Sequence, residues 1–228
     1  MRIYSARVRE IQSLAGGLAA WIDCPAAAIP AVGQYTLASD PEDETAPIAS
    51  PIFLAEGGTE GFLAAPPVPI PWTPGKTLFL RGPLGRGFSL PVAARHVVLA
   101  ALDTTAARLL PLVSLALARG AAVALFDDAA LPPLPAAVEA YPLNTLPELL
   151  PWADFIALDL STATLPELRL QLGLGAHEQL PCPSQALVLA AMPCGGLAEC
   201  GVCAVPARPG WKLACKDGPV FNLDEIIW

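Results

Sequence analysis

The sequence predicts an antiparallel β-barrel, then an α/β domain with a parallel sheet, then a small cysteine-rich lobe. Three observations support this fold class. Short strand-like runs broken by Pro and Gly fill the first ninety residues, longer apolar runs alternate with helical segments after them, and four of the six cysteines lie in the last 35 residues. The predicted boundaries are 1–90, 91–191 and 192–228.

The barrel is predicted from five short runs bounded by Pro, Gly or Asp, at the spacing typical of small antiparallel barrels. They are Tyr4–Glu10, Gly17–Cys24, Gln34–Ala38, Pro51–Ala55 and Lys76–Arg81. Residues 64–71 are dense in proline, which cannot donate a ladder hydrogen bond, so this segment is not expected to form a central strand.

The second domain is predicted from four continuous apolar runs, which are typical of strands covered on both faces. These runs are His96–Leu102, Ala121–Phe126, Asp154–Leu160 and Gln185–Ala191. Helices are expected between them at Ala106–Arg119, Leu146–Trp152 and Leu165–Leu172. Asp103 is the expected N-cap of the first helix and Gly120 its C-cap.

Charge and hydropathy exclude two classes of partner. Thirteen Lys+Arg against 21 Asp+Glu give a net charge of −8. No basic cluster offsets this charge, which argues against a nucleic-acid groove. The most apolar window, Leu109–Ala118, is bounded by Arg108 and Arg119 and is far shorter than the ~20 residues of a membrane span. The N-terminus has no apolar signal core, so the protein is expected to be soluble and cytoplasmic.

The spacing of four C-terminal cysteines indicates metal ligation. Cys194, Cys200, Cys203 and Cys215 follow the pattern C-x5-C-x2-C-x11-C, one residue longer in its first gap than the plant-type [2Fe–2S] spacing. Glycines between them would let backbone N–H groups approach the sulfurs. A structural Zn²⁺ is an alternative, although zinc usually uses two C-x2–4-C knuckles, and unligated buried thiols are another. Cys24 and Cys182 are interpreted as ordinary thiols.

Three segments resemble the electron-transfer subunit of dihydroorotate dehydrogenase, a member of the ferredoxin reductase-like superfamily with a C-terminal [2Fe–2S] domain. They are MPCGGLAECGVC at 192–203, WKLACKDGPVF at 211–221 and PGKTLFLRGPLGRGF at 74–88. The resemblance implies a flavin-binding-like barrel, a nucleotide-binding-like α/β domain and a [2Fe–2S] cluster. In that family the catalytic partner's FMN oxidises dihydroorotate, and electrons pass through the cluster to FAD and on to NAD.

The flavin-contacting strand of the family carries Arg-Pro-x-Ser/Thr, and this sequence departs from it. The corresponding stretch is Ala49-Ser50-Pro51-Ile52-Phe53. Ser50 replaces the arginine that would pair with flavin phosphate, and Phe53 replaces the hydroxyl. Charge would then have to come from Arg81 or Arg86, so the sequence leaves FAD binding open but argues against it.

The nucleotide-binding turn also departs from the family pattern. A glycine-rich turn normally brings a helix N-terminus to the pyrophosphate, whereas residues 102–107 read LDTTAA. Asp103 places a carboxylate where phosphate would bind, so NAD binding in the family's manner is not expected. Asp127 and Asp128, at the end of a predicted strand, are interpreted as a solvated turn.

The sequence therefore predicts a non-catalytic iron–sulfur subunit of an oxidoreductase complex. It would pass electrons from the FMN-containing catalytic subunit of dihydroorotate dehydrogenase, an enzyme of pyrimidine biosynthesis, to an acceptor, within a hetero-oligomer. Trp211, Leu213 and Phe221 are the predicted apolar partner face. The alternatives are a flavin-free [2Fe–2S] relay or docking subunit of another oxidoreductase, and a zinc-stabilised interaction protein.

Overall fold

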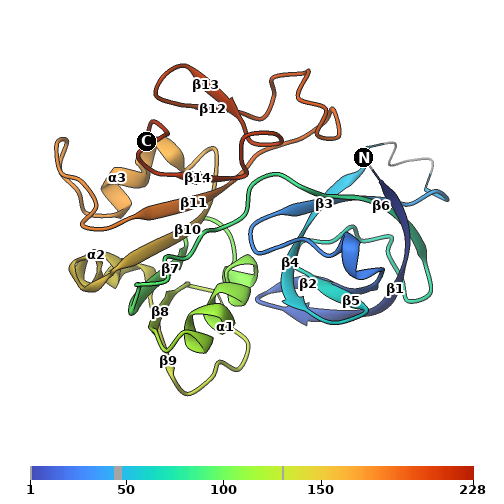
Figure 1. Cartoon of the computed structure of the whole chain (residues 1–228), viewed down its shortest axis with the longest axis horizontal. Helices are drawn as coiled ribbons and strands as arrows, with labels where there is room; N and C mark the ends of the chain where they lie inside the picture. Colours follow the sequence, from blue (N-terminus) through green and yellow to red (C-terminus); the bar gives the residue numbers. More distant parts are fainter. Residues whose placement is uncertain (1, 44–47, 130) are drawn as a thin grey trace.

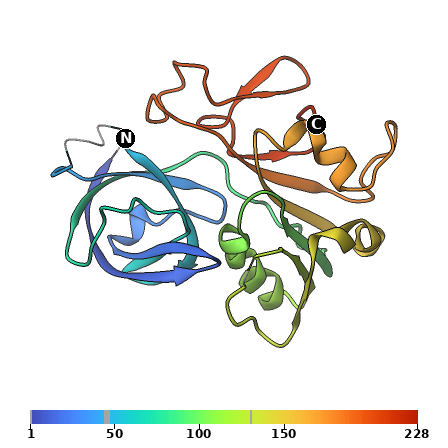
Figure 2. The same cartoon turned by 180° about the vertical axis from the view of Figure 1, so that it is seen from behind.

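The computed structural model describes residues 2–43, 48–129 and 131–228. Its strands form a closed barrel, a six-stranded sheet and a two-stranded hairpin. Figure 1 shows the barrel on one side of the molecule, the sheet with its helices on the other, and the hairpin above the sheet. Figure 2 shows the same division from behind. The predicted fold class is confirmed.

The barrel closes in the strand order β1-β2-β5-β4-β3-β6, with neighbouring strands antiparallel. The strands are β1 (Ile3–Leu14), β2 (Gly17–Asp23), β3 (Tyr35–Ser39), β4 (Ser50–Gly57), β5 (Gly61–Ala64) and β6 (Thr77–Leu84). Alternation places Leu78 and Leu80 inside the barrel while Phe79 between them stays partly exposed. The sequence did not predict β5, which is only four residues long and directly precedes the proline-rich segment.

The sheet of the second domain has the order β14-β11-β10-β7-β8-β9. Its strands are β7 (His96–Ala101), β8 (Ala122–Phe126), β9 (Val138–Tyr141), β10 (Phe155–Ser161), β11 (Ser184–Leu189) and β14 (Val220–Asn222). Neighbouring strands are parallel except β14, which pairs antiparallel with β11. The C-terminal segment that carries the cysteines therefore supplies one edge of this sheet.

Helices cover both faces of the sheet, which explains the apolar runs. Val97 and Leu99 of β7 pack in one buried cluster with α1 (Leu110–Ala118), while Val98 belongs to the cluster that contains α2 (Leu146–Leu149) and α3 (Leu168–Gln171). All three helices are shorter than predicted, because 3-10 turns replace part of each predicted segment. Among the residues described, no helix has the length and apolarity needed to span a membrane.

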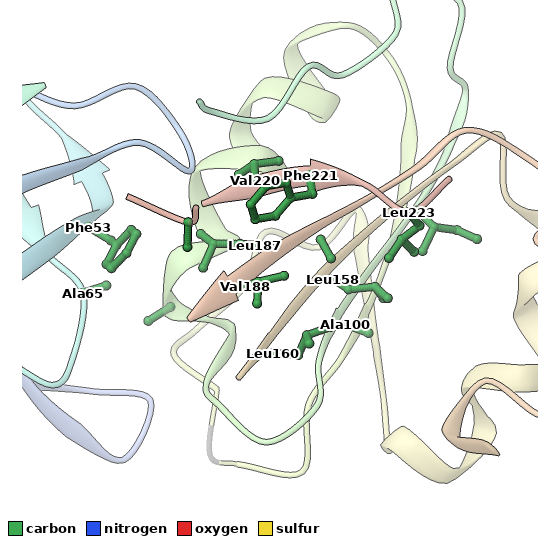
Figure 3. Close-up of a cluster of buried hydrophobic side chains, with 14 of the residues drawn as sticks. Phe53, Ala65, Ala100, Leu158, Leu160, Leu187, Val188, Val220, Phe221 and Leu223 are labelled. Atoms are coloured by element: carbon green, nitrogen blue, oxygen red, sulfur yellow. The ribbon is translucent and has the colours of Figure 1, made fainter. Parts of the chain in front are cut away.

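The barrel and the sheet share one hydrophobic core. Phe53 and Ala65 on the barrel side belong to the same buried cluster as Leu187, Val220 and Phe221 of the sheet. Figure 3 shows these side chains, with Val220 and Phe221 on β14 beside Leu187 on β11. Because this cluster also contains Cys203 and Cys215, the cysteine-rich segment is built into the common core.

Candidate metal centre

Strand pairing brings the last two cysteines of the pattern together. The hairpin strands β12 (Ala204–Pro206) and β13 (Trp211–Leu213) are antiparallel, with Ala204 opposite Leu213. Ala214 then donates a 2.9 Å backbone hydrogen bond to the carbonyl of Cys203. Cys203 directly precedes the hairpin and Cys215 directly follows Ala214. The hairpin therefore brings these two cysteines together across the eleven residues that separate them in sequence.

The four thiols form two contacting pairs. The side chains of Cys194 and Cys200 lie close enough to influence each other's ionisation, and so do those of Cys203 and Cys215. The pairs are close enough for the charge of Cys194 to act on Cys215. The structure therefore places the four sequence-predicted ligands as two neighbouring pairs, and none of the four is in a disulfide.

The two pairs differ in their electrostatic environment. Desolvation alone would raise the pKa of the Cys194 thiol, but hydrogen bonds from the backbone N–H of Glu199 and the side chain of Cys200 outweigh it. With a further backbone bond from Leu197, they lower the pKa to about 6. Burial and the neighbouring thiol of Cys203 raise the pKa of Cys215 to about 12. The lowered pKa favours the thiolate form of Cys194, and the N–H groups responsible belong to Glu199, Leu197 and Cys200 rather than to the glycines of the loop.

The paired arrangement bears on which metal fits. A tetrahedral Zn²⁺ draws four sulfurs to one point, whereas the two irons of a [2Fe–2S] cluster take two ligands each. Within the part of the chain that the structure describes, no three His, Cys, Asp or Glu side chains converge as the ligands of a single ion. The thiols instead lie as two neighbouring pairs, and backbone N–H groups act on a sulfur of each pair, those of Glu199 and Leu197 on Cys194 and that of Ala198 on Cys215.

The cysteine loop lies against the barrel. Gly195 and Gly196 have positive φ angles of 60° and 73°, which favour glycine. A methyl group on Gly196 would lie 2.9 Å from the phenol oxygen of Tyr35. The same phenol donates a 2.8 Å hydrogen bond to the backbone carbonyl of Cys215. Sequence reasoning missed Tyr35, because it lies about 160–180 positions before the residues it contacts.

Two of the sequence segments that carried the resemblance contact each other. After β6, the backbone N–H of Arg86 donates to the carbonyl of Gly218, and the N–H of Val220 donates to the carbonyl of Arg86. A Cβ on Gly85 would lie 2.5 Å from that same Gly218 oxygen, so only glycine allows this approach. The barrel-closing turn thus holds the segment that follows the fourth cysteine.

Three exposed apolar side chains lie on the cysteine loop or on the hairpin that follows it. The exposed fractions are 55% for Leu197, 58% for Val202 and 69% for Trp211, and Cys200 is itself exposed. Of the predicted partner face, Trp211 is exposed and Leu213 is half-buried. Phe221 was wrongly included, because its ring is fully buried in the core beneath β14.

The flavin-like strand borders a small cavity between the barrel and the second domain. This cavity of about 380 Å³ is lined by Ser50, Pro51, Phe53, Leu189, Arg108 and the segment 65–69. Of the described residues that line it, Arg108 is the single cation, and neither Arg81 nor Arg86 reaches it. Arg86 instead forms an ion pair with Glu225 at 3.5 Å.

The charge of Arg108 is already neutralised inside the protein. Its guanidinium makes two hydrogen bonds to the fully buried Asp159 of β10, at 2.7 and 3.2 Å. A third bond of 2.9 Å reaches the carbonyl of Pro66 on the barrel side, and the guanidinium lies over the Phe53 ring. Thr104 donates to the same carboxylate. Arg108 therefore joins the two domains and has no free charge to offer a phosphate.

A carboxylate does sit at the helix N-terminus, but the predicted residue was wrong. Asp103 is not the cap, because its carboxylate accepts hydrogen bonds from the backbone N–H and hydroxyl of Ser161. The N-cap of the 3-10 turn before α1 is Thr105, whose side chain accepts a bond from the N–H of Ala107. The carboxylate at this end of the turn is that of Asp127, which accepts a 2.7 Å bond from the N–H of Ala106. Asp127 is only 8% exposed, so its interpretation as part of a solvated turn was also wrong.

The remaining two cysteines lie outside the constellation. Cys24 is buried beside the barrel, where burial raises its pKa to about 11. Cys182 lines a cavity of about 730 Å³ beside β11, together with His177, Arg169 and Arg208. Arg169 donates two hydrogen bonds to backbone carbonyls there and stacks on Trp228, so its guanidinium is occupied by the protein itself.

Comparison with known proteins gives a family match for the cysteine segment. Residues 190–227 match the iron–sulfur cluster binding domain of dihydroorotate dehydrogenase B. This match contains all four cysteines of the constellation. A comparison with curated proteins gives no significant sequence match.

Solved structures share the fold along most of the chain. An NADH-dependent reduced ferredoxin–NADP oxidoreductase superposes with a TM-score of 0.75 at 17% identity, covering 97% of this chain and 89% of that one. The ferredoxin reductase of carbazole 1,9a-dioxygenase gives 0.58 at 18% identity, covering 76% and 66%. An Amycolatopsis cytochrome P450 reductase gives 0.56 at 17% identity, covering 75% and 66%.

These identities establish the fold alone, and the family match establishes the character of the C-terminal segment. The resemblance stated from the sequence is therefore confirmed in two parts: residues 190–227 match an iron–sulfur cluster binding domain of the dihydroorotate dehydrogenase B kind, and the chain as a whole has a ferredoxin reductase-like fold.

Proposed function

We propose that this protein is a one-electron carrier that binds a [2Fe–2S] cluster through Cys194, Cys200, Cys203 and Cys215 and lacks both FAD and NAD. Its partner would be the FMN-containing catalytic subunit of a dihydroorotate dehydrogenase. Oxidation of dihydroorotate gives two electrons and two protons to that flavin, and the cluster would carry the electrons one at a time to a one-electron acceptor.

The observation that carries the proposal is the two-plus-two pairing of the thiols. Cys194 with Cys200 and Cys203 with Cys215 offer two ligands to each of two irons. The family match over residues 190–227 supports the same ligand set. Backbone N–H groups directed at Cys194 would stabilise the negative charge of a bound cluster.

The absence of FAD is supported by the cavity beside Ser50 and Phe53. Its volume of about 380 Å³ lies near the lower end of the ~300–1,000 Å³ typical of ligand pockets. Most of the residues that line it are apolar, four of them prolines, and the charge of Arg108 is neutralised by Asp159. A flavin pyrophosphate would therefore enter a site without a free cation, which is strongly unfavourable.

The absence of NAD is supported by Asp127. Its carboxylate already accepts the hydrogen bond of Ala106 N–H, which a nucleotide phosphate would otherwise receive at this helix start. A phosphate brought to the same N–H group would be repelled by the buried negative charge. Without a flavin to split a hydride into single electrons, the acceptor must itself take one electron at a time.

The direct test is to purify the protein anaerobically and determine iron, inorganic sulfide, zinc and flavin per chain. We expect about two irons, two sulfides, no flavin and a paramagnetic signal after dithionite reduction. C200S should lose the cluster, whereas C182S, which alters a thiol outside the constellation, should keep it. Stoichiometric zinc with no iron would overturn the proposal, and bound FAD would overturn its flavin-free part.

The partner is tested by mixing. Dihydroorotate should bleach the cluster absorbance only when the FMN-containing catalytic subunit is present. The exposed side chains of Leu197 and Val202 on the cysteine loop and of Trp211 on the hairpin are where this partner would bind. W211K should weaken the complex and slow bleaching without changing iron content. If the cluster-loaded protein and the catalytic subunit neither associate nor exchange electrons, a different flavoprotein is the electron donor.

A further inference from the structure

The barrel places a positive charge beside the cysteine loop. Arg81 lies in the middle of β6, opposite Ile3 of β1 and Leu37 of β3. A methyl group on Gly195, the residue after Cys194, would lie 3.3 Å from its Nη2 atom. A methyl group on Gly196 would lie 3.8 Å from the same atom. The guanidinium therefore packs directly against the backbone of the loop.

The neighbouring barrel strand places a phenol at the fourth cysteine. Tyr35 of β3 is fully buried, and its hydroxyl donates to the carbonyl of Cys215 at 2.8 Å. Burial raises the pKa of Tyr35 first of all, and the thiol of Cys215 raises it further, whereas Arg81 lowers it. The phenol, the guanidinium and the thiols thus lie within electrostatic reach of one another.

We propose that Arg81 and Tyr35 tune the reduction potential of the cluster, Arg81 by raising it with its charge and Tyr35 by fixing the backbone of the Cys215 ligand. This inference rests on the proposed function, since it requires a bound cluster. Both side chains come from the barrel, so the barrel would serve the cluster as an electrostatic support in place of holding a flavin.

That the charge of Arg81 should raise the reduction potential follows from Coulomb's law. A [2Fe–2S] centre with four thiolates gains one negative charge on reduction, and a nearby cation stabilises the more negative state more strongly. Charges and hydrogen bonds around the sulfurs are established determinants of cluster potentials. In a half-buried position such as that of Arg81, screening by salt is weaker than at the open surface.

The experiment is a redox titration of cluster-loaded protein followed by visible absorbance and paramagnetic resonance. R81Q should lower the ratio of reduced to oxidised cluster about tenfold at a fixed potential, a shift of ~59 mV for one electron. R81K, which keeps the charge, should have a ratio of reduced to oxidised cluster close to that of wild type. Y35F should change this ratio by a smaller factor than R81Q does, about two- to threefold.

The matched control is R9Q. Arg9 lies on the same barrel in an exposed ion pair with Asp23, six residues along β1 from the residue opposite Arg81. R9Q removes the same charge ~20 Å farther along the strand, so it should leave the ratio of reduced to oxidised cluster unchanged. If R81Q shifts the potential no more than R9Q does, the inference is wrong while the proposed function stands.

A second variant guards against loss of the cluster in R81Q. In R81H the charge at this position depends on pH, since free histidine titrates near pH ~6.5. The potential of R81H should rise toward that of wild type at low pH and fall at pH ~8, whereas wild type and R9H should show no such step. A flat profile in cluster-loaded R81H would refute the role of the charge. Wild type without iron would instead refute the proposed function, and this inference with it.

Discussion

The guanidinium of Arg108 and the carboxylate of Asp159 form a two-point ion pair that is almost completely removed from solvent. The pair connects the start of α1 with the centre of the sheet, and its third hydrogen bond, to Pro66, connects both with the barrel. Arg108 also lines the cavity beside Ser50 and Phe53. The buried charges of Arg108 and Asp159 at this domain junction are therefore neutralised by each other.

Removing one member of this pair should be costly. R108M leaves the Asp159 carboxylate buried without its cation, and such changes cost about 3–5 kcal/mol of unfolding free energy. R9M, which breaks the exposed pair with Asp23, should cost at most ~1 kcal/mol. Urea unfolding of both variants provides the comparison. The double variant R108M/D159L should recover much of the loss, and equal costs for R108M and R9M would contradict this account.

The contact between the cysteine loop and the barrel gives a second prediction. G196A adds a methyl group 2.9 Å from the hydroxyl of Tyr35 at a φ of 73°. G210A is its control, because Gly210 has the same φ but no atom within 4 Å of the added methyl group. Both carry backbone strain of order 1–3 kcal/mol, and only G196A also displaces the loop. We expect faster loss of iron in G196A, followed by bleaching of visible absorbance, and near wild-type rates in G210A.

The capping role of Asp127 gives a third prediction. D127A removes the acceptor of the Ala106 N–H group, and loss of such a cap costs about 0.5–2 kcal/mol. D127N retains an oxygen acceptor and should lose less. The melting temperatures of the two variants, measured beside wild type, test the ranking. A D127A protein as stable as wild type would mean that solvent and the side chain of the N-cap residue Thr105 satisfy this end of the turn equally well.

Acid sensitivity gives a fourth prediction, at Asp103. Burial alone would raise the pKa of its carboxyl, but the hydrogen bonds from Ser161 outweigh it and lower the pKa below the ordinary value. A lowered folded-state pKa contributes stability that is present above the unfolded pKa of ~3.9 and is lost as pH falls through the folded value. D103N should therefore be less stable than wild type at pH 7.

The two proteins should converge in stability below the folded pKa of Asp103, where the wild-type carboxyl is protonated as well. Urea midpoints between pH ~7 and ~2.5 measure this convergence. D224N, at an exposed position near the C-terminus, is the control for a general charge effect. A stability difference between D103N and wild type that stays constant across the range would contradict the assignment.

Much of the fold followed from hydrophobic pattern. The continuous run at His96–Leu102 predicted β7 because helices cover both its faces, and the alternation at Tyr4–Glu10 predicted β1 because one face is solvated. Strand β9 gave no such signal, since its residues are half-buried or exposed at the edge of the sheet. Strand β5 is too short to show a period.

The four cysteines of the candidate site could be predicted from the sequence, but the side chains of the barrel that contact the cysteine loop could not. Cysteine spacing and local motifs identified the four thiols, because three of them lie within ten residues. Tyr35 and Arg81 could not be found in this way, since contacts across more than a hundred residues depend on how the barrel packs against the loop. Asp103 was predicted as the cap because it lies just before the helix in sequence, whereas the pairing of β7 with β8 brings Asp127, which follows β8, to the N–H of Ala106.

Strand β14 begins five residues after Cys215 and completes the edge of the six-stranded sheet by pairing with β11. Anchoring Cys215 to a cluster would thus also hold this edge strand in register. An apoprotein whose tail has detached would offer the main-chain groups of β11 to any other extended chain, and unprotected sheet edges of this kind promote aggregation. Delivery of iron and sulfide would then decide how long the newly made chain remains monodisperse, as well as whether it can accept an electron.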